Sequence, residues 1–232
     1  MIKINENQIA NSYEEESFIN IWDIRNENCI KILEGHQNDV ISLVLITKFK
    51  LASGSSDRSI KIWNILTGEC LQTIKGGSGY VRCLIKINTY QIAGGCFAKN
   101  IRVWDVVAGI CICILKGHLD YVKCLIKLNK SKIASGSRDK SIKVWDIITG
   151  SCLKTLEGHS NCVYCIIKIN ENKIVSCSNN FKMWDIISGS CLVTLKKPTN
   201  RIICLIKLND FQVVCSYFDN YSIKIMDLFD KE

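Results

Sequence analysis

Residues 117–157 read GHLDYVKCLIKLNKSKIASGSRDKSIKVWDIITGSCLKTLE, and this stretch decides the fold. It holds four runs typical of β-strands, separated by short polar turns, at Val122 to Leu128, Lys132 to Ser137, Ser141 to Ile147 and Cys152 to Leu156. None of these runs has the apolar spacing of an amphipathic helix. The stretch therefore predicts a unit of four β-strands.

The same pattern recurs along the chain with a period of about 40 residues. The tryptophans are spaced by 41 residues, with a last step of 39, and lie at Trp22, Trp63, Trp104, Trp145 and Trp184. Each histidine follows a tryptophan by 14 residues, at His36, His118 and His159. A four-stranded unit cannot bury its own faces, so we expect each unit to pack against its neighbours around a common axis.

A Gly-His pair followed by Trp-Asp marks the fourth unit, at Gly117-His118 and Trp145-Asp146, and Gly35-His36 to Trp63-Asn64 is a close match. In these motifs and in its period the chain resembles the WD-repeat β-propeller family. The resemblance implies an all-β propeller of about six blades, each a four-stranded antiparallel sheet, with incomplete first and last blades. It covers residues 1–232 as a single domain, with units 1–34 (partial), 35–75, 76–116, 117–157, 158–196 and 197–232 (partial).

The strand count leaves the closure of the propeller open. The pattern predicts 22 strands, or 23 with a short stretch at Met1 to Ile4, whereas six four-stranded blades need 24. Three arrangements fit this count: a six-bladed ring with short edge blades, a fragment of a larger propeller, or a ring completed by another chain. We favour the first.

The resemblance assigns two sets of four residues to buried hydrogen-bonded tetrads, His36, Ser53, Asp57 and Trp63, and His118, Ser135, Asp139 and Trp145. An indole N–H, a hydroxyl, an imidazole and a carboxylate can satisfy one another inside a blade. The sequence leaves open whether the first serine of each Ser-Gly-Ser run takes part or the second. In the third unit Gly77 and Ala98 replace the histidine and the aspartate, a joint loss that can be nearly neutral.

We predict no enzymatic activity and no cofactor. The serine, histidine and aspartate recur in several units, the serine lies inside a strand, and no G-x-S-x-G, G-x-G-x-x-G or phosphate-loop motif is present. We also predict no metal and no disulfide, because the cysteines recur at fixed positions of the repeat, which is typical of small apolar slots. One such position holds Cys29, Cys70, Cys111, Cys152 and Cys191.

The opening residues lack a secretion signal and no apolar run could cross a bilayer, so we expect a cytoplasmic protein, with the nucleus as the alternative. The net charge of +8 raises the question of nucleic acid. Lysines share one position of the repeat and should form a cationic circle, at Lys3, Lys86, Lys127, Lys168 and Lys207. We do not expect nucleic acid as the partner, because no aromatic stacking positions accompany these lysines.

Propellers of the family generally bind partners on the face formed by the loops around Gly-His and before the repeat aspartate. The residues there that differ between units include types enriched at interface hot spots, namely Tyr80, Phe97, Tyr121, Arg138 and Arg201. We therefore predict a non-catalytic protein-interaction scaffold that binds a peptide or domain through these residues, as a monomer or within a larger complex. The alternatives are a substrate-recognition or adaptor subunit, for example of a ubiquitin ligase, and a basic nucleic-acid or phosphoinositide binder.

Overall fold

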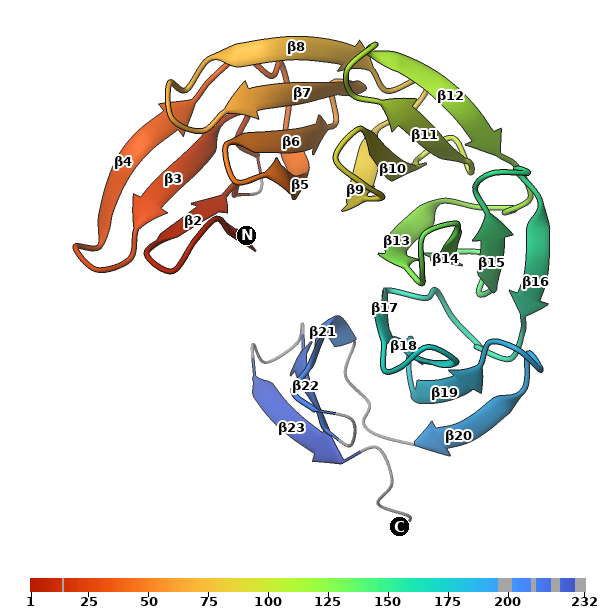
Figure 1. Ribbon diagram of the computed structural model, residues 1–232. Coiled ribbons are helices and arrows are strands. Elements are labelled where there is room, and N and C mark those ends of the chain that lie inside the picture. The colour runs from red at the N-terminus through yellow and green to blue at the C-terminus, as the bar shows by residue number, and fades with distance from the viewer. Residues whose placement is uncertain (14, 196–201, 210–211, 218–221, 228–232) are drawn as a thin grey trace. The chain divides into compact units, whose positions relative to one another are not determined.

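The computed structural model describes residues 1–13, 15–195, 202–209, 212–217 and 222–227. The described residues form 23 strands and no helix, so the predicted all-β class is confirmed (Figure 1). The chain divides into two compact units, Met1–Ile114 and Leu115–Glu232, and each contains three antiparallel sheets. Each sheet corresponds to one predicted blade.

The three sheets of the first unit are meanders of four strands each. The first sheet contains β1 (Ile2–Lys3), β2 (Gln8–Asn11), β3 (Ile19–Asp23) and β4 (Asn28–Leu33). The second contains β5 (Val40–Thr47), β6 (Lys50–Ser55), β7 (Ser59–Asn64) and β8 (Cys70–Lys75). The third contains β9 (Val81–Lys86), β10 (Gln91–Cys96), β11 (Ile101–Asp105) and β12 (Ile110–Leu115).

The second unit has two four-stranded sheets and one of three strands among its described residues. The fourth sheet contains β13 (Val122–Lys127), β14 (Lys132–Ser137), β15 (Ile142–Asp146) and β16 (Cys152–Leu156). The fifth contains β17 (Cys165–Lys168), β18 (Lys173–Cys177), β19 (Phe181–Asp185) and β20 (Cys191–Leu195). The sixth contains β21 (Ile202–Lys207), β22 (Gln212–Tyr217) and β23 (Ile223–Asp227).

The first and last blades differ in how far they are complete. The first sheet has four strands, because Ile2 and Lys3 pair with Ala10 and Ile9, so this blade falls short only in the length of β1. The last sheet has three strands within the described residues, as the sequence pattern predicts.

Alternation of side chains places the apolar residues of neighbouring strands on the faces between sheets. In the fourth sheet Ile133 lies opposite Trp145, and both are fully buried. One core of the first unit joins the second and third sheets and includes Ile60, Ile74 and Trp104. A core of the second unit joins the fourth and fifth sheets in the same way. Burial between sheets, about 25 cal/mol per Å² of apolar surface, is the main stabilising contribution of such packing.

A glycine at the same repeat position lets adjacent sheets approach. A β-carbon on Gly54 would lie 2.7 Å from Val81 Cγ1, the first residue of the next sheet. In the second unit a β-carbon on Gly136 would lie 2.6 Å from Val163 Cγ1. Both distances are shorter than real contacts of β-carbons, so the middle residue of each Ser-Gly-Ser run has to be glycine for the sheets to pack this closely.

Candidate binding loops and the buried tetrads

The second blade contains a complete hydrogen-bonded chain from its tryptophan to its aspartate. Trp63 Nε1 donates to Ser53 Oγ over 2.7 Å, and Ser53 Oγ lies 2.7 Å from His36 Nε2. His36 Nδ1 lies 2.7 Å from the Asp57 carboxylate. This order suits a neutral imidazole that carries its proton on Nδ1, accepts from the serine and donates to the aspartate.

The fourth blade repeats the arrangement with nearly the same distances. Trp145 Nε1 lies 2.8 Å from Ser135 Oγ, which lies 2.7 Å from His118 Nε2, and His118 Nδ1 lies 2.7 Å from Asp139. The fifth blade has an asparagine in the last place, where Asn180 Oδ1 lies 3.2 Å from His159 Nδ1. The structure thus brings together both sets of four residues that the resemblance assigned to tetrads.

The tetrad environments shift the pKa values of their titratable groups. Burial lowers the pKa of His36, and it lowers the pKa of His159 to about 4, because the charged imidazolium would lose its hydration. Burial opposes ionisation of Asp57, but hydrogen bonds from Ser59, Gln37 and His36 outweigh it and hold the pKa of that carboxyl at about 2. The tetrad of the second blade therefore favours a neutral His36 beside an ionised Asp57 at neutral pH.

The structure also distinguishes the paired serines. Ser53 and Ser135 join the tetrads, whereas the hydroxyls of Ser55 and Ser137 donate to the backbone carbonyls of Asn38 and Asp120 over 2.9 Å. Alternate residues share one face of a strand, so sequence spacing could not separate these two roles.

Sequence reasoning missed one member of each network. Ser59 Oγ lies 2.6 Å from the Asp57 carboxylate, and Ser141 repeats this contact with Asp139. The signal was present, since a serine follows each of these aspartates by two residues.

The tetrad serines are fully buried and accept the indole N–H, so no substrate can reach their hydroxyls.

The third blade keeps only the tryptophan of the tetrad. Gly77, Gly94 and Ala98 stand at the positions of histidine, serine and aspartate, and Trp104 Nε1 donates instead to the Lys75 carbonyl over 3.3 Å. The ring of Trp104 closes over Gly94, where a β-carbon would lie 2.9 Å from Cζ3. This blade has therefore repacked around the absent polar groups.

The predicted partner-binding residues form pairs within their own blades. In the third blade Phe97 N donates to the Tyr80 carbonyl over 3.0 Å, and the two rings lie 5.2 Å apart. In the fourth blade Arg138 N donates to the Tyr121 carbonyl over 2.9 Å, and the guanidinium lies 5.6 Å from the Tyr121 ring. The Arg138 guanidinium also faces Asp120 at 3.8 Å. We call each such pair, the residue before the first strand and the residue before the aspartate position, a loop pair.

The loop pairs differ in exposure and chemistry from blade to blade. Tyr80 and Phe97 are 40% and 38% exposed, and the Arg138 side chain is 59% exposed. The second blade has Asp39 and Ser56 in these places, and in the fifth blade Cys162 is buried. Arg201 lies outside the described residues. Among the described loop pairs, the exposed aromatic and arginine side chains thus belong to the third and fourth blades, which lie in different units.

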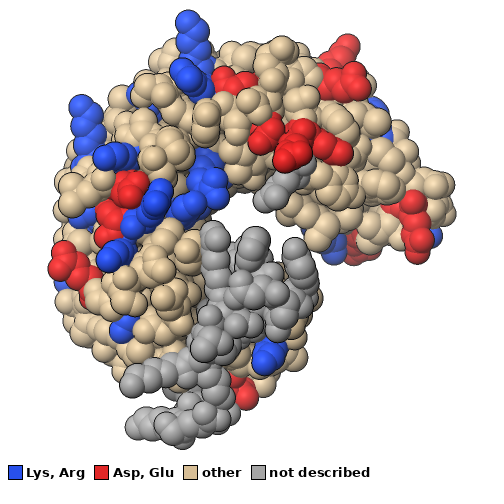
Figure 2. Space-filling view, turned by 180° about the vertical axis from the view of Figure 1, so that it is seen from behind, with Lys and Arg blue, Asp and Glu red and all other residues tan. Residues whose placement is uncertain are grey.

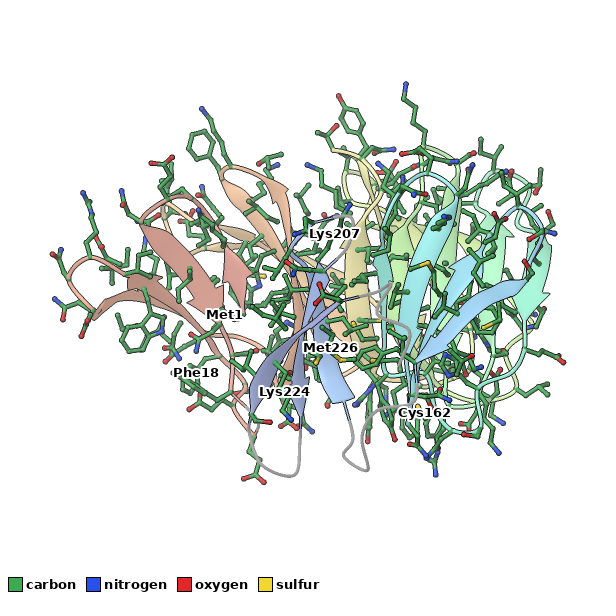
Figure 3. All side chains as sticks on the ribbon, turned by 90° about the horizontal axis from the view of Figure 1, so that it is seen from below. Met1, Phe18, Cys162, Lys207, Lys224 and Met226 are labelled. Atoms are coloured by element: carbon green, nitrogen blue, oxygen red, sulfur yellow. The ribbon has the colours of Figure 1, made fainter. Side chains whose placement is uncertain are left out.

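Two of the repeated lysines serve packing between sheets. Lys168 Nζ donates to the Leu128 carbonyl of the preceding sheet over 2.5 Å, and Lys207 Nζ donates to the Ile169 carbonyl. Figure 3 shows Cys162 and Lys207 at opposite ends of the sheets of the second unit, so the loop-pair end and the lysine end are distinct. Basic side chains lie among acidic and uncharged ones on the face seen in Figure 2.

Among the described residues no cysteine forms a disulfide, and the predicted apolar slot is wrong for four of the five cysteines at the position that opens the last strand. Cys29, Cys70, Cys152 and Cys191 are exposed, and each thiol lies 3.4–3.5 Å from the carbonyl two residues later. The outer strand has one face in solvent, which explains why a recurring residue there need not be buried. Within the described residues no group of three or more His, Cys, Asp or Glu side chains could hold a metal ion.

A family model for the WD domain, G-beta repeat, matches residues 27–64, 109–146 and 150–185. These matches and the succession of antiparallel sheets decide the family. The chain belongs to the WD-repeat β-propeller family. No curated protein matches it. The WD-repeat propeller is typical of protein-interaction scaffolds and is generally non-catalytic. Among the described residues of this WD-repeat chain, no helix is both long and apolar enough to span a membrane.

Proposed function

We propose that this WD-repeat chain is a non-catalytic scaffold that binds a peptide or domain of another protein through its exposed loop pairs. The observation that carries the proposal is the loop pair of the third blade, in which two aromatic rings pack together at the surface, each more than a third exposed. Aromatic side chains offer a large contact area at small loss of rotamer entropy, and they are enriched at hot spots.

The fourth blade supports the same proposal with different chemistry. Arg138 contacts the Tyr121 ring and Asp120, which holds the guanidinium in place while more than half of the side chain stays exposed. An arginine positioned in this way is ready to bind a carboxylate or a backbone carbonyl of a partner. The histidines lie buried in the tetrads, so the tetrads contribute architecture and the loop pairs contribute recognition.

Affinity capture from a cell lysate followed by mass spectrometry tests the proposal. The full chain is compared with Tyr80→Ala/Phe97→Ala and with Tyr121→Ala/Arg138→Ala. Each double variant should lose partners that the full chain retains, while its unfolding midpoint stays near that of the parent.

Phe49→Ala/Tyr90→Ala is the matched control, because these two aromatics are 44% and 63% exposed but lie in the turns between first and second strands. Loss of the same partners in this control, or their retention in both loop-pair variants, would show that binding uses another surface. Capture of RNA or anionic vesicles that collapses steeply with added salt would favour the electrostatic alternative.

An adaptor or substrate-recognition role is a finer form of the proposed function. It predicts that the captured proteins include both a stable complex and a variable set of clients. The nucleic-acid alternative is weakened by the inter-sheet hydrogen bonds of Lys168 and Lys207, which use two of the five repeated lysines.

A further inference from the structure

The third blade has an arginine where three other blades have a lysine. Arg102 occupies the strand position of Lys61, Lys143 and Lys182, two residues before each tryptophan. Each of those lysines donates through Nζ to a threonine hydroxyl on the outer strand over 2.8 Å, namely Thr73, Thr155 and Thr194. The third blade has Ile114 at the threonine position, so Arg102 finds no hydroxyl there.

The Arg102 guanidinium lies instead against the loop that precedes β9. A β-carbon on Gly77 would lie 2.7 Å from both Cζ and Nε of Arg102, and 3.0 Å from Nη2. Gly77 has a φ of 113°, and it stands where the tetrad blades have histidine. The guanidinium therefore occupies space that position 77 leaves free because it has no side chain.

The Arg102 guanidinium carries a charge that no carboxylate among the described residues neutralises. Among the described residues, no carboxylate lies within ion-pair distance of Arg102, and its buried Nε atom has no hydrogen-bond partner. The neighbouring Asn100 has a buried Oδ1 atom without a partner, and this acceptor calls for a donor, whereas Arg102 calls for an acceptor. An uncompensated charge that is partly removed from water is unfavourable, and an incoming anion relieves it.

The second blade shows which anion fits this place. There the Asp57 carboxylate accepts hydrogen bonds from Ser59 N over 2.8 Å and from Ser59 Oγ over 2.6 Å. In the third blade Ala98 removes that carboxylate, while Asn100 stands at the position of Ser59 and offers a backbone N–H and a carboxamide NH₂. The residues at these positions thus include donors that a carboxylate could use, together with a guanidinium, which pairs with a carboxylate through two parallel hydrogen bonds.

The loop that covers this place reaches solvent beside the loop pair. Ser78 is exposed, Gly77 and Ala98 are partly exposed, and Ala98 directly follows Phe97 in the chain. A ligand that reaches Arg102 through this loop therefore passes next to the aromatic pair of Tyr80 and Phe97. An apolar residue beside the acidic one could pack on these two rings.

We propose that the third blade binds a glutamate side chain of a partner peptide, with Arg102 and Asn100 holding its carboxylate in the place of the missing tetrad aspartate. The inference rests on the proposed function and names the chemistry of the partner: an acidic residue next to an apolar one. Glutamate suits this role because a carboxylate that enters from outside the blade needs reach, and the glutamate side chain is one methylene longer than that of aspartate.

Nuclear magnetic resonance on the ¹⁵N-labelled full chain tests this directly, since the Arg102 Nε–H gives a signal of its own. The probes are N-acetyl-Phe-Glu-amide and its matched control N-acetyl-Phe-Gln-amide, each added to about 20 mM so that a Kd of about 1 mM is saturated. We expect a saturable shift of the Arg102 signal with the glutamate probe and none with the glutamine probe.

Two variants sharpen the result. Ala98→Asp restores an internal carboxylate beside Arg102 and should abolish the response, lowering the affinity at least tenfold. Lys99→Ala removes a neighbouring exposed charge of the same sign and should leave the affinity within twofold. Any of four results overturns the inference. Arg102 does not respond to the glutamate probe, it responds equally to both probes, it responds equally to inorganic phosphate, or its response to the glutamate probe is unchanged in Ala98→Asp.

The readouts separate this inference from the proposed function. Shifts of the Tyr80 and Phe97 amides with both dipeptides, without an Arg102 response, would support the aromatic loop pair and overturn the carboxylate site. The opposite outcome is that Tyr80→Ala/Phe97→Ala keeps both the Arg102 response and the captured partners. That outcome would support the carboxylate site and contradict the loop pair as the recognition surface.

Discussion

The second and third blades lie next to each other in one unit and solve the same packing problem in two ways. The second buries a ready-made polar chain in which every group is satisfied from within the blade. The third has lost three of the four groups: Trp104 donates to a backbone carbonyl, and the Arg102 guanidinium lies beside Gly77 at the histidine position. A repeat unit can therefore drop its polar network without losing its strands, and what replaces the network is free to acquire another role.

The largest expected effect on the free energy of unfolding comes from exchanging the residues at the aspartate position, with alanine in the second blade and aspartate in the third. Asp57→Ala removes the acceptor of four hydrogen bonds, from His36, Gln37 and Ser59, and should lower the free energy of unfolding by about 3 kcal/mol. Ala98→Asp pairs Arg102 and should raise it by about 1 kcal/mol. Urea unfolding measures both. A loss of more than about 1 kcal/mol in Ala98→Asp would mean that the third blade has no room for a carboxylate.

The pH dependence of stability should come from the second and fifth blades, in which burial lowers the pKa of the histidine. The pKa of His159 is about 4 in the folded chain and 6.5 without perturbation, so the unfolded chain binds more protons between these values and stability falls as the pH falls. At pH 5 the loss relative to neutral pH is about 2 kcal/mol from this residue. Asp57, with a pKa of about 2, adds its loss only below about pH 4.

Thermal unfolding of the parent and of His159→Gln at pH 5 and pH 7.5 measures this effect. The difference in the free energy of unfolding between pH 7.5 and pH 5 should be about 2 kcal/mol smaller in the variant than in the parent. A pH dependence that is unchanged in the variant would show that His159 is protonated in the folded chain. The third blade has no titratable group at this position, so it should contribute nothing in this range.

The contrast between the two blades also marks how far the sequence alone could lead. The spacing of Trp63 and Trp104 predicted the strands of both blades, because buried aromatic residues at a fixed period reflect sheets that repeat. The loss of the histidine and aspartate in the third blade was visible as Gly77 and Ala98. What took their place was not, because Arg102, Gly77 and Ile114 lie far apart in the chain and are related only through the folded blade.

The same limit applies to finer details of the site. Ser53 and Ser55 lie on the same face of one strand, and only the position of the His36 ring separates them. The loop residues Tyr80 and Phe97 could be picked out as candidate interface aromatics, but the contact between their rings and the backbone hydrogen bond between their loops are visible only in the structure. Patterns of burial therefore carry the fold, whereas contacts between loops need the structure.

A smaller effect tests whether the tetrad was lost as a set. In the second blade the cycle of His36→Gly, Asp57→Ala and the double variant should show a coupling energy of about 1 to 2 kcal/mol, because the second change no longer breaks a bond that the first has removed. Additive losses, measured by urea unfolding, would mean that the two side chains act independently. The joint presence of Gly77 and Ala98 in the third blade would then need another cause.

The smallest effect on stability is expected from a substitution on the outer strand of the third blade. The same substitution should change the binding of the glutamate probe. Ile114→Thr recreates in the third blade the hydroxyl that Lys61 uses in the second, where Lys61 Nζ lies 2.8 Å from Thr73 Oγ1. A single exposed hydrogen bond of this kind should change the free energy of unfolding by less than about 0.5 kcal/mol. It gives the Arg102 guanidinium an alternative to its place against Gly77, however, so the affinity for N-acetyl-Phe-Glu-amide should fall about threefold or more. Ile112→Thr on the same strand is the control. Equal affinities in both variants would show that Ile114 has no part in the direction that Arg102 takes.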